Sequence, residues 1–228
     1  MFNRVDERVI VMQDLDAIGF TQRLDQANNN QIKQIISWLA FFHAKHLNVS
    51  PNLLWPKGTY WHLATRPDEL EALDDMALKN GAKLIDDKLS NCPIQSIVHG
   101  DAKLANFCFN PTNHTVAGVD FQYTGGGVGV KDLAYFLGSC LNESQCQQSA
   151  FKWVGVYFEE LSQAMTQQQS SINFNEVEQL WRPLFEFAWV DFHRFLKGWS
   201  PGHWKINDFS EQLSKKVIKE ISTSTILK

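Results

Sequence analysis

The sequence predicts an α+β fold that is mainly helical and carries short β-hairpins. Helical periodicity fills most of the chain, and three short apolar runs near its middle are broken by turn residues. The composition is that of a globular domain, because 44% of the 228 residues are hydrophobic and 20% are charged. These values exclude a disordered or fibrous chain. A chain of this length buries roughly 70% of its unfolded surface, so we expect one large domain.

The charge balance and the segment composition exclude several classes of protein. Lys and Arg number 21 against 25 Asp and Glu, so the chain lacks the basic face that nucleic-acid binding requires. No run of about 18 apolar residues occurs, and acids stand where a signal peptide would have a basic start. We therefore expect a cytoplasmic protein that binds neither nucleic acid nor membrane. The cysteines lack CxxC spacing and are expected to be reduced and mostly buried: Cys92, Cys108, Cys140 and Cys146.

The first half of the chain is expected to begin with a hairpin and continue with two helices. Residues 2–12 carry β-branched residues around a probable turn, which indicates the hairpin. From Asn28 to about Leu47 the apolar residues recur at helical spacing behind capping asparagines. A loop over residues 51–65 precedes a second helix, from Pro67 towards Leu89, whose first-turn acids suit the helix dipole.

The second half is expected to hold short strands and then only helices. Strands are predicted at residues 94–98, 106–109 and 115–121, where short apolar runs end in turn residues. The glycine-rich run 125–129 lacks the form of a phosphate-binding loop and is interpreted as a flexible connector. Helices are then predicted over residues 131–140, 144–167, 175–197 and 208–226.

Two short motifs carry the chemistry that the sequence suggests. The first is H-G-D-A-K-L-A-N at residues 99–106, and the second is V-D-F-Q at residues 119–122. Phosphoryl transfer needs a carboxylate near the attacking hydroxyl and oxygen ligands for Mg²⁺. Asp101 leaves a strand into a turn, Asn106 follows five residues later, and Asp120 ends the next strand, so all three can face one cleft. The alternative is a turn whose aspartates only bond the backbone.

These motifs resemble the catalytic core of the aminoglycoside/choline kinase-like family, and more closely its ecdysteroid-kinase-like branch. The run K-D-L-A-Y-F-L at residues 131–137 adds to the resemblance. Residues 9–15 look like the last strand of a kinase small lobe and the hinge after it. The resemblance implies a protein-kinase-like large (C-terminal) lobe over residues 16–228, with a vestigial small-lobe hairpin and hinge over residues 1–15.

The same resemblance implies an ATP- and Mg²⁺-dependent phosphotransferase that acts on a hydroxyl group of a small molecule. It makes Asp101 the catalytic base and assigns Mg²⁺ to Asn106 and Asp120. Lys103 is placed to reach the transferring phosphate. The backbone of Gln13, Asp14 and Leu15 would then hold the adenine. His99 is expected to be structural and to form a hydrogen bond across the catalytic loop. Asp132 is expected to cap a helix or to brace the catalytic loop, and not to be a ligand.

Kinase-like enzymes of this kind carry a small lobe ahead of the hinge, with a phosphate-covering loop and a lysine that pairs the phosphates. Here the first glycine is Gly19 and the first lysine is Lys33, both after the hinge candidate. We therefore expect either a part of a longer enzyme or a protein without that lobe. The alternative function is a truncated or pseudo-kinase lobe that binds a small molecule or a partner protein without turnover. A purely structural helical domain is the third possibility. A hairpin without sheet partners also favours a homodimer through residues 2–13.

The substrate side of the site is expected in two aromatic segments, the loop over residues 55–62 and a segment late in the chain. Trp199, His203 and Trp204 lie around a Ser-Pro-Gly turn, and aromatic rings can hold a cation by cation–π contact. Packing explains these three residues equally well. The other tryptophans at helical spacing (Trp153, Trp181 and Trp189) are assigned to the core, and Asp191 and Arg194 to a helical ion pair.

Overall fold

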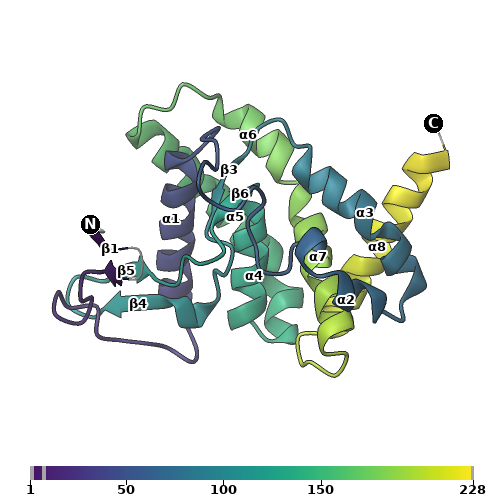
Figure 1. Cartoon of the computed structure of the whole chain (residues 1–228), viewed down its shortest axis with the longest axis horizontal. Coiled ribbons are helices and arrows are strands. Elements are labelled where there is room, and N and C mark those ends of the chain that lie inside the picture. The colour runs from purple at the N-terminus through teal and green to yellow at the C-terminus, as the bar shows by residue number, and fades with distance from the viewer. Residues whose placement is uncertain (1–2, 7–8, 227–228) are drawn as a thin grey trace.

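The computed structural model describes residues 3–6 and 9–226 and confirms a mainly helical α+β architecture (Figure 1). Eight α-helices and six short strands lie within the described residues. The helices are α1 (Asn29–Lys45), α2 (Pro67–Glu71), α3 (Met76–Ser90), α4 (Val130–Cys140), α5 (Glu143–Gln167), α6 (Phe174–Trp181), α7 (Leu184–Trp199) and α8 (Asp208–Ile226). The strands are β1 (Asn3–Asp6), β2 (Val9–Val11), β3 (Ser96–Val98), β4 (Phe107–Asn110), β5 (Thr115–Gly118) and β6 (Gly125–Gly127).

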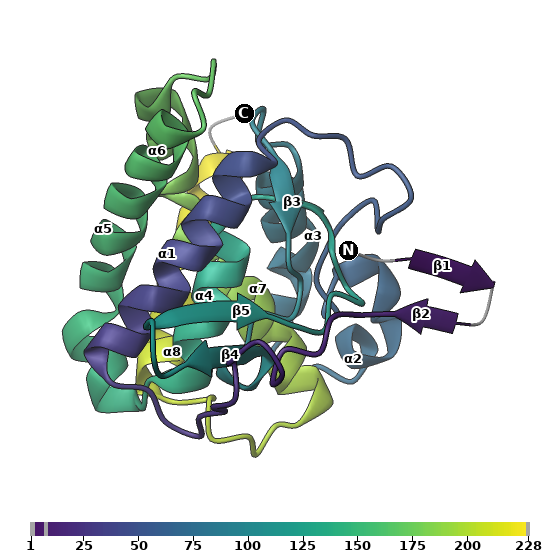
Figure 2. The ribbon, with the colours of Figure 1, turned by 90° about the vertical axis from the view of Figure 1, so that its left-hand side faces the viewer.

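The helices form a body around one large hydrophobic core, and strands β3 to β6 lie against it. α1 packs along α5, while α7 is central and contacts α2, α3, α4 and α8 (Figure 2). Fully buried side chains from several helices meet in this core, among them Ile35, Leu133 and Trp181. Trp153, Trp181 and Trp189 are all buried, as predicted. No helix in the part of the chain that the structure describes has the length and apolar character that a membrane crossing needs.

Capping residues explain why the predicted starts of α1 and α5 are close to the observed ones. The Asn28 side chain accepts the backbone N–H of Gln31, and the Gln31 side chain accepts the backbone N–H of Asn28. Asn142 and Gln145 form the same reciprocal pair ahead of α5. Such capping boxes satisfy backbone donors that a helix start leaves unpaired.

Two predicted helices are each divided in two, and both predictions were wrong in this respect. The helix expected from Pro67 to Leu89 ends at Glu71, and α3 begins after Asp75, whose side chain accepts the Leu78 N–H. The helix expected over 175–197 is broken between α6 and α7 at Pro183. Proline lacks the N–H that an uninterrupted helix uses, and its ring obstructs the preceding turn.

The strands pair in three antiparallel two-stranded sheets within the described residues: β1 with β2, β3 with β6, and β4 with β5. The pairing of β3 with β6 corrects the interpretation of residues 125–129 as a flexible connector. Gly125 pairs with Val98, and a Cβ on Gly125 would lie 2.3 Å from the Trp55 carbonyl oxygen. The glycines are therefore used for close backbone packing, which fixes this segment against β3 and the Trp55 loop.

The predicted N-terminal hairpin is present as β1 and β2, which project from the helical body (Figure 2). Val11 and Met12 are exposed at the end of this hairpin. Phe2, the first residue of the predicted hairpin, lies outside the described residues. The homodimer expected through residues 2–13, and the division of the chain at residue 15, stay predictions.

A buried histidine on α7 predicts how the stability of the fold depends on pH. His193 is 1% exposed, neither ring nitrogen has a hydrogen bond, and burial lowers its pKa to about 4 despite the neighbouring Glu211. A histidine in the unfolded chain titrates near pH 6.5, so between these values the unfolded state binds more protons. Stability should therefore fall as the pH decreases through this range, by up to about 1.4 kcal/mol per pH unit.

Urea unfolding of the wild type and His193→Gln at pH 7, 6 and 5 tests this expectation. The variant should lose less stability on acidification than the wild type. Part of the pH dependence should remain in the variant, because burial also lowers the pKa of His62. Carboxylates with lowered pKa values affect stability only from about pH 5 downwards, and they do so in both proteins. Equal slopes for the two proteins would contradict the assignment.

Candidate active site

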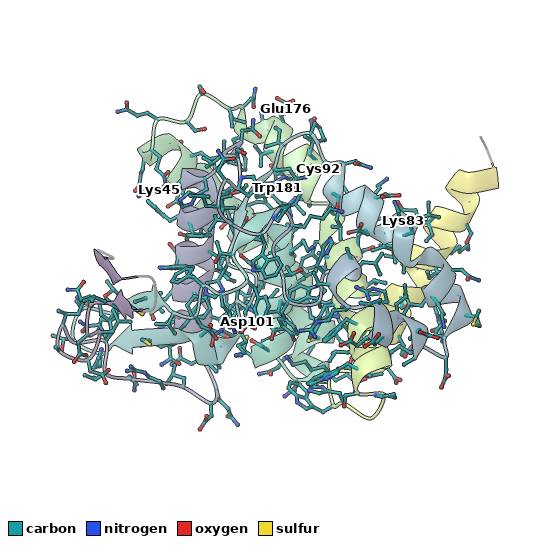
Figure 3. The ribbon with its side chains drawn as sticks, viewed as in Figure 1. Lys45, Lys83, Cys92, Asp101, Glu176 and Trp181 are labelled. Atoms are coloured by element: carbon teal, nitrogen blue, oxygen red, sulfur yellow. The ribbon has the colours of Figure 1, made fainter. Side chains whose placement is uncertain are left out.

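The H-G-D motif forms the loop between β3 and β4, and its aspartate is buried near the middle of the molecule (Figure 3). Asp101 is 3% exposed. Its Oδ2 atom accepts hydrogen bonds from Lys103 Nζ and Asn106 Nδ2, each at 3.0 Å. Its Oδ1 atom is buried and has no hydrogen-bond partner. The loop therefore brings Asp101, Lys103 and Asn106 together and leaves one carboxylate oxygen without a donor.

Asn106 is oriented by Asp101 so that its amide oxygen remains an acceptor. Its Nδ2 group donates to the main-chain oxygen of Asp101 at 2.8 Å as well as to Oδ2, which uses the donor end of the amide. The Val119 N–H donates to the Asn106 carbonyl oxygen at 2.9 Å. This hydrogen bond holds the neighbouring Asp120 close to Asn106. Asp120 is exposed and has a φ of 65°. An amide oxygen and an exposed carboxylate are hard oxygen donors, so this pair fits Mg²⁺.

His99 holds the two motifs together, as predicted for a bracing residue. It is fully buried; its Nδ1 accepts the Asp101 N–H at 3.2 Å, and its Nε2 lies 2.9 Å from the Val119 carbonyl oxygen. These partners place the proton of a neutral ring on Nε2, which donates to Val119. One histidine thus fixes the position of Asp101 relative to the segment that carries Asp120.

Asp132, at the start of α4, braces the same loop from below. Its Oδ2 accepts the His99 N–H at 2.6 Å, and its Oδ1 accepts the Gly100 N–H at 3.0 Å. His43 Nε2 on α1 lies 3.0 Å from Oδ2, and its other ring nitrogen contacts the Tyr157 hydroxyl. Burial raises the pKa of Asp132, but the hydrogen bond and charge of His43 outweigh this, and the pKa is lowered. The carboxylate is therefore a fixed anchor for the loop.

Gly100 is required between these two anchored residues. Its φ is 83°, and a Cβ there would lie 2.1 Å from the Tyr123 carbonyl oxygen. A side chain would therefore push apart the Asp101 loop and the loop after Asp120.

Two tyrosines lie beside the catalytic loop, and of these the sequence indicated only Tyr60, as part of the aromatic loop over residues 55–62. The hydroxyls of Tyr60 and Tyr135 lie 3.2 Å apart, and the Tyr60 N–H donates to the Gly100 carbonyl oxygen. Burial raises the pKa of Tyr60 to about 12, and the charge of Asp101 adds to the rise. Burial raises the pKa of Tyr135 further, with contributions from Tyr60 and Asp101. Tyr135 belongs to the K-D-L-A-Y-F-L run, but nothing in the sequence pairs it with Tyr60.

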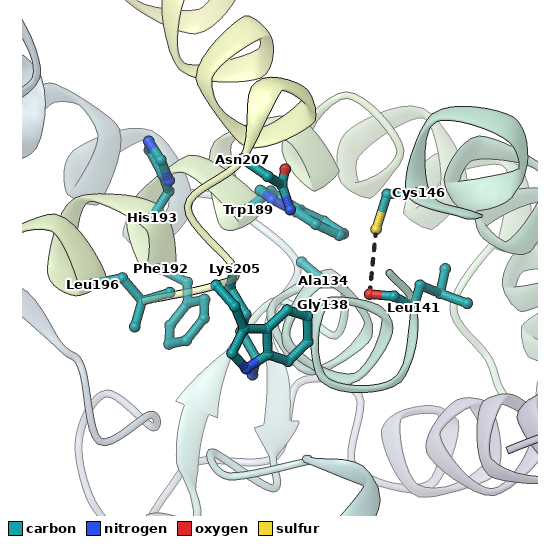
Figure 4. Close-up of a pocket in the computed structure, with 11 residues that line it drawn as sticks. Ala134, Gly138, Leu141, Cys146, Trp189, Phe192, His193, Leu196, Lys205 and Asn207 are labelled. Atoms are coloured by element: carbon teal, nitrogen blue, oxygen red, sulfur yellow. Dashed lines mark hydrogen bonds between the residues drawn. The ribbon is translucent and has the colours of Figure 1, made fainter. Parts of the chain in front are cut away.

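Lys205, in the loop between α7 and α8, was not indicated by the sequence. Its ammonium lies over the rings of Tyr135, Phe192 and Trp204, at 5.1, 5.5 and 5.6 Å from their centroids. Burial lowers the pKa of Lys205 to about 8. The charge of Lys103 lowers this pKa further, whereas the charge of Asp101 raises it. Figure 4 shows Lys205 beside Phe192 and the face of α4 that carries Gly138. The narrow pocket drawn there has an interior of about 10 Å³, room for about one water molecule.

The predicted substrate residues form an aromatic series on the surface next to Lys205. Trp199 and Trp204 are each 58% exposed, and the His203 ring lies between them, 6.5 and 5.8 Å from their ring centroids. Trp204 also contacts Lys205, which connects this series to the region of Asp101. Their role towards a substrate stays a prediction.

The predicted adenine-binding residues lie in the loop that follows β2. Gln13 and Asp14 are exposed and Leu15 is half-buried. Asp14 Oδ1 accepts the N–H groups of Asp16 and Ala17, which shapes the turn after the hinge candidate. Backbone hydrogen bonds between Gln22 and Phe109 then attach this segment to β4. No hydrogen bond or ion pair between described residues joins residues 13–15 to the catalytic loop, and their role stays a prediction.

Comparison with known proteins gives one finding that bears on this site. The ecdysteroid kinase-like family matches residues 57–170, which is half of the chain. No curated protein matches the chain. The matched segment contains Asp101, Lys103, Asn106 and Asp120, as well as Asp132 and the tyrosine pair, whereas residues 13–15 and 199–204 lie outside it. The chain belongs to the ecdysteroid kinase-like family, a branch of the aminoglycoside phosphotransferase/choline kinase-like superfamily.

Proposed function

We propose that the protein is an ATP- and Mg²⁺-dependent phosphotransferase that acts on a hydroxyl group of a small molecule. The observation that carries the proposal is the geometry of Asp101. One carboxylate oxygen is held by Lys103 and Asn106, while the other, Oδ1, is buried without a partner. A buried acceptor without a donor is costly, and an incoming hydroxyl would satisfy it. Oδ1 is then the atom that takes the hydroxyl proton.

The neighbouring residues support the remaining parts of this reaction. Asn106 Oδ1 and the exposed Asp120 carboxylate would hold Mg²⁺, which supplies charge compensation for the phosphates when it is bound. Lys103 keeps a positive charge beside Asp101 and is 40% exposed, so it can also contact a phosphate group. Family membership supports a small-molecule acceptor and a kinase-like lobe as the scaffold. The backbone of residues 13–15 is the proposed contact for the adenine.

The proposal is tested first by isothermal titration of Mg·ATP into the chain, with Asp120→Asn as the matched variant. We expect binding that weakens at least about tenfold in the variant, because one oxygen ligand of the metal loses its charge. The same titration with ATP and EDTA separates metal-dependent from metal-independent binding. Absence of binding to a folded sample would contradict the proposal for this chain and favour the pseudo-kinase alternative, in which the lobe binds a partner or small molecule without turnover.

A further inference from the structure

A second pocket lies at the opposite end of β3 from the catalytic loop. It has a volume of about 200 Å³, far more than one water molecule requires. It is lined by the loop before Tyr60, the end of α3, the start of β3 and the glycine strand β6, with Pro51, Lys57, Leu89, Ser96, Gly126 and Lys131 among its residues. Ser96 begins β3, whereas Asp101 follows its end. The pocket is therefore distinct from the proposed phosphotransfer site.

The lining of this pocket contains two ammonium groups and no carboxylate. Lys131 is 4% exposed, and its only ion-pair partner among the described residues is Asp191, with 3.8 Å between Nζ and Oδ2. This separation is too long for a hydrogen bond. Lys57 is 40% exposed at its side chain and donates one hydrogen bond, to Asp86 Oδ2 at 3.0 Å. Burial lowers the pKa of Lys131, while the charges of Asp191, Asp86 and Asp132 oppose this.

The groups behind the lysines are also short of acceptors. Asp191 is already used by Trp61 Nε1 and Arg194 Nη2, each at 3.0 Å, and two other guanidinium nitrogens of Arg194 are buried without a partner. His62 Nδ1 accepts the Ala64 N–H, so its proton lies on Nε2, which has no hydrogen-bond partner and is 3.6 Å from Asp86 Oδ1.

The remaining polar atoms of the wall are already satisfied. Ser96 Oγ donates to the His43 carbonyl oxygen, and Gln95 Nε2 donates to the carbonyl oxygens of Leu89 and Cys92. Asp132 acts on Lys131 by charge, but its oxygens accept His43 and two backbone N–H groups. A buried donor without an acceptor costs about 1–3 kcal/mol, and more when it is charged. The group missing from this network is therefore an acceptor, and the charge of the lining favours an anion.

We propose that this pocket binds a small oxyanion of the phosphate or carboxylate class between Lys131 and Lys57. Lys131 provides the buried ammonium, whose unused N–H donors would reach the anion. Lys57, at the more exposed wall, has donors free after its bond to Asp86. The site is independent of the proposed phosphotransfer reaction, because none of its lining residues belongs to the catalytic loop or the metal pair.

The test is thermal unfolding in increasing inorganic phosphate at constant ionic strength, in the absence of nucleotide and metal. At fifty times its dissociation constant, phosphate should raise the wild-type Tm by roughly 5 °C. Lys131→Met should abolish this rise. The rise is measured from the Tm that each protein has without phosphate, because methionine also removes the attraction between Lys131 and Asp191, Asp86 and Asp132. Lys57→Met should reduce the rise in Tm. Because Lys57 is half-exposed, this second variant tests the site even if Lys131→Met fails to fold.

Two control variants identify where the phosphate binds. Lys83→Met removes an exposed surface lysine and should keep the full response. Lys103→Met removes the ammonium beside Asp101, and this variant should also keep the full rise in Tm with phosphate. The proposal is wrong if phosphate gives no shift in the wild type, if the shift persists undiminished in both the Lys131→Met and Lys57→Met variants, or if it disappears in Lys103→Met, which would place the anion at the catalytic loop.

Discussion

Replacement of Asp132 by asparagine is expected to lower the free energy of unfolding by about 3–5 kcal/mol, the usual cost of breaking a buried, hydrogen-bonded charge pair. Asp132 is fully buried and uses both oxygens, towards His43 and towards the N–H groups of His99 and Gly100. Asparagine has the same shape, but its NH₂ group would meet a donor where the carboxylate now accepts. A buried donor would then face a buried donor, and the charge that holds His43 would be lost.

Urea unfolding measures this change, and Asp87→Asn is the matched control. Asp87 pairs with Lys83 on the exposed face of α3, where an ion pair contributes at most about 1 kcal/mol. The expected result is a large loss for Asp132→Asn and a small one for Asp87→Asn, with similar urea dependence in both. Similar small losses in the two variants would mean that Asp132 does not anchor the H-G-D loop.

The parts of the fold that could be predicted from the sequence are those that local chemistry determines. Asn28 and Asn142 are capping residues with a glutamine three positions later. Four consecutive residues are therefore enough to predict where α1 and α5 begin. The β4–β5 hairpin follows from the turn around Asn110, whose side chain accepts the N–H groups of Thr112 and Asn113. The break at Pro183 was also visible locally, but apolar spacing on both sides favoured one continuous helix.

The glycine strand β6 could not be predicted, because the residues that order it lie elsewhere in the chain. Glycine has no side chain to show a strand period, and the run 125–129 is typical of a flexible segment. The partners that order it are Val98 and the loop at Trp55, which contact it through the backbone. Long-range backbone packing of this kind leaves no periodic pattern in the sequence.

In the candidate site, too, contacts between residues close in sequence could be predicted and contacts between distant segments could not. Asp101, Lys103 and Asn106 are close in sequence, and the structure brings them into direct contact. Tyr60 and Lys205 come from loops far from the H-G-D motif and reach it only through the packing of α4 and α7. Tyr60 belongs to the aromatic loop that the sequence indicated on the substrate side, but no spacing pattern shows that it contacts the H-G-D loop, and none selects Lys205. The bracing role of Asp132 was predictable because it lies in a motif that resembles the family.

Replacement of Asp101 by asparagine is expected to have the largest effect on catalysis, a loss of about 10²–10⁴ in the rate of phosphate transfer. Asparagine preserves the size of the side chain but cannot take the proton that Oδ1 is placed to accept. Mg·ATP affinity should change little, because the metal is assigned to Asn106 and Asp120 and not to Asp101. Asp120→Asn, in contrast, should lose both nucleotide affinity and turnover.

The measurement is transfer of the terminal phosphate of ATP to a panel of hydroxylated acceptors, with each variant first shown to be folded by its Tm. The two aspartates give opposite patterns only if they have different roles: a proton acceptor acts on the rate alone, whereas a metal ligand acts on binding and rate together. Asp101 is also the centre of a hydrogen-bond cluster, so a loss of stability could imitate a loss of catalysis. The Tm of each variant separates these effects, because a variant that remains folded at the assay temperature cannot lose turnover by unfolding. Full turnover in folded Asp101→Asn would show that Oδ1 is not the proton acceptor.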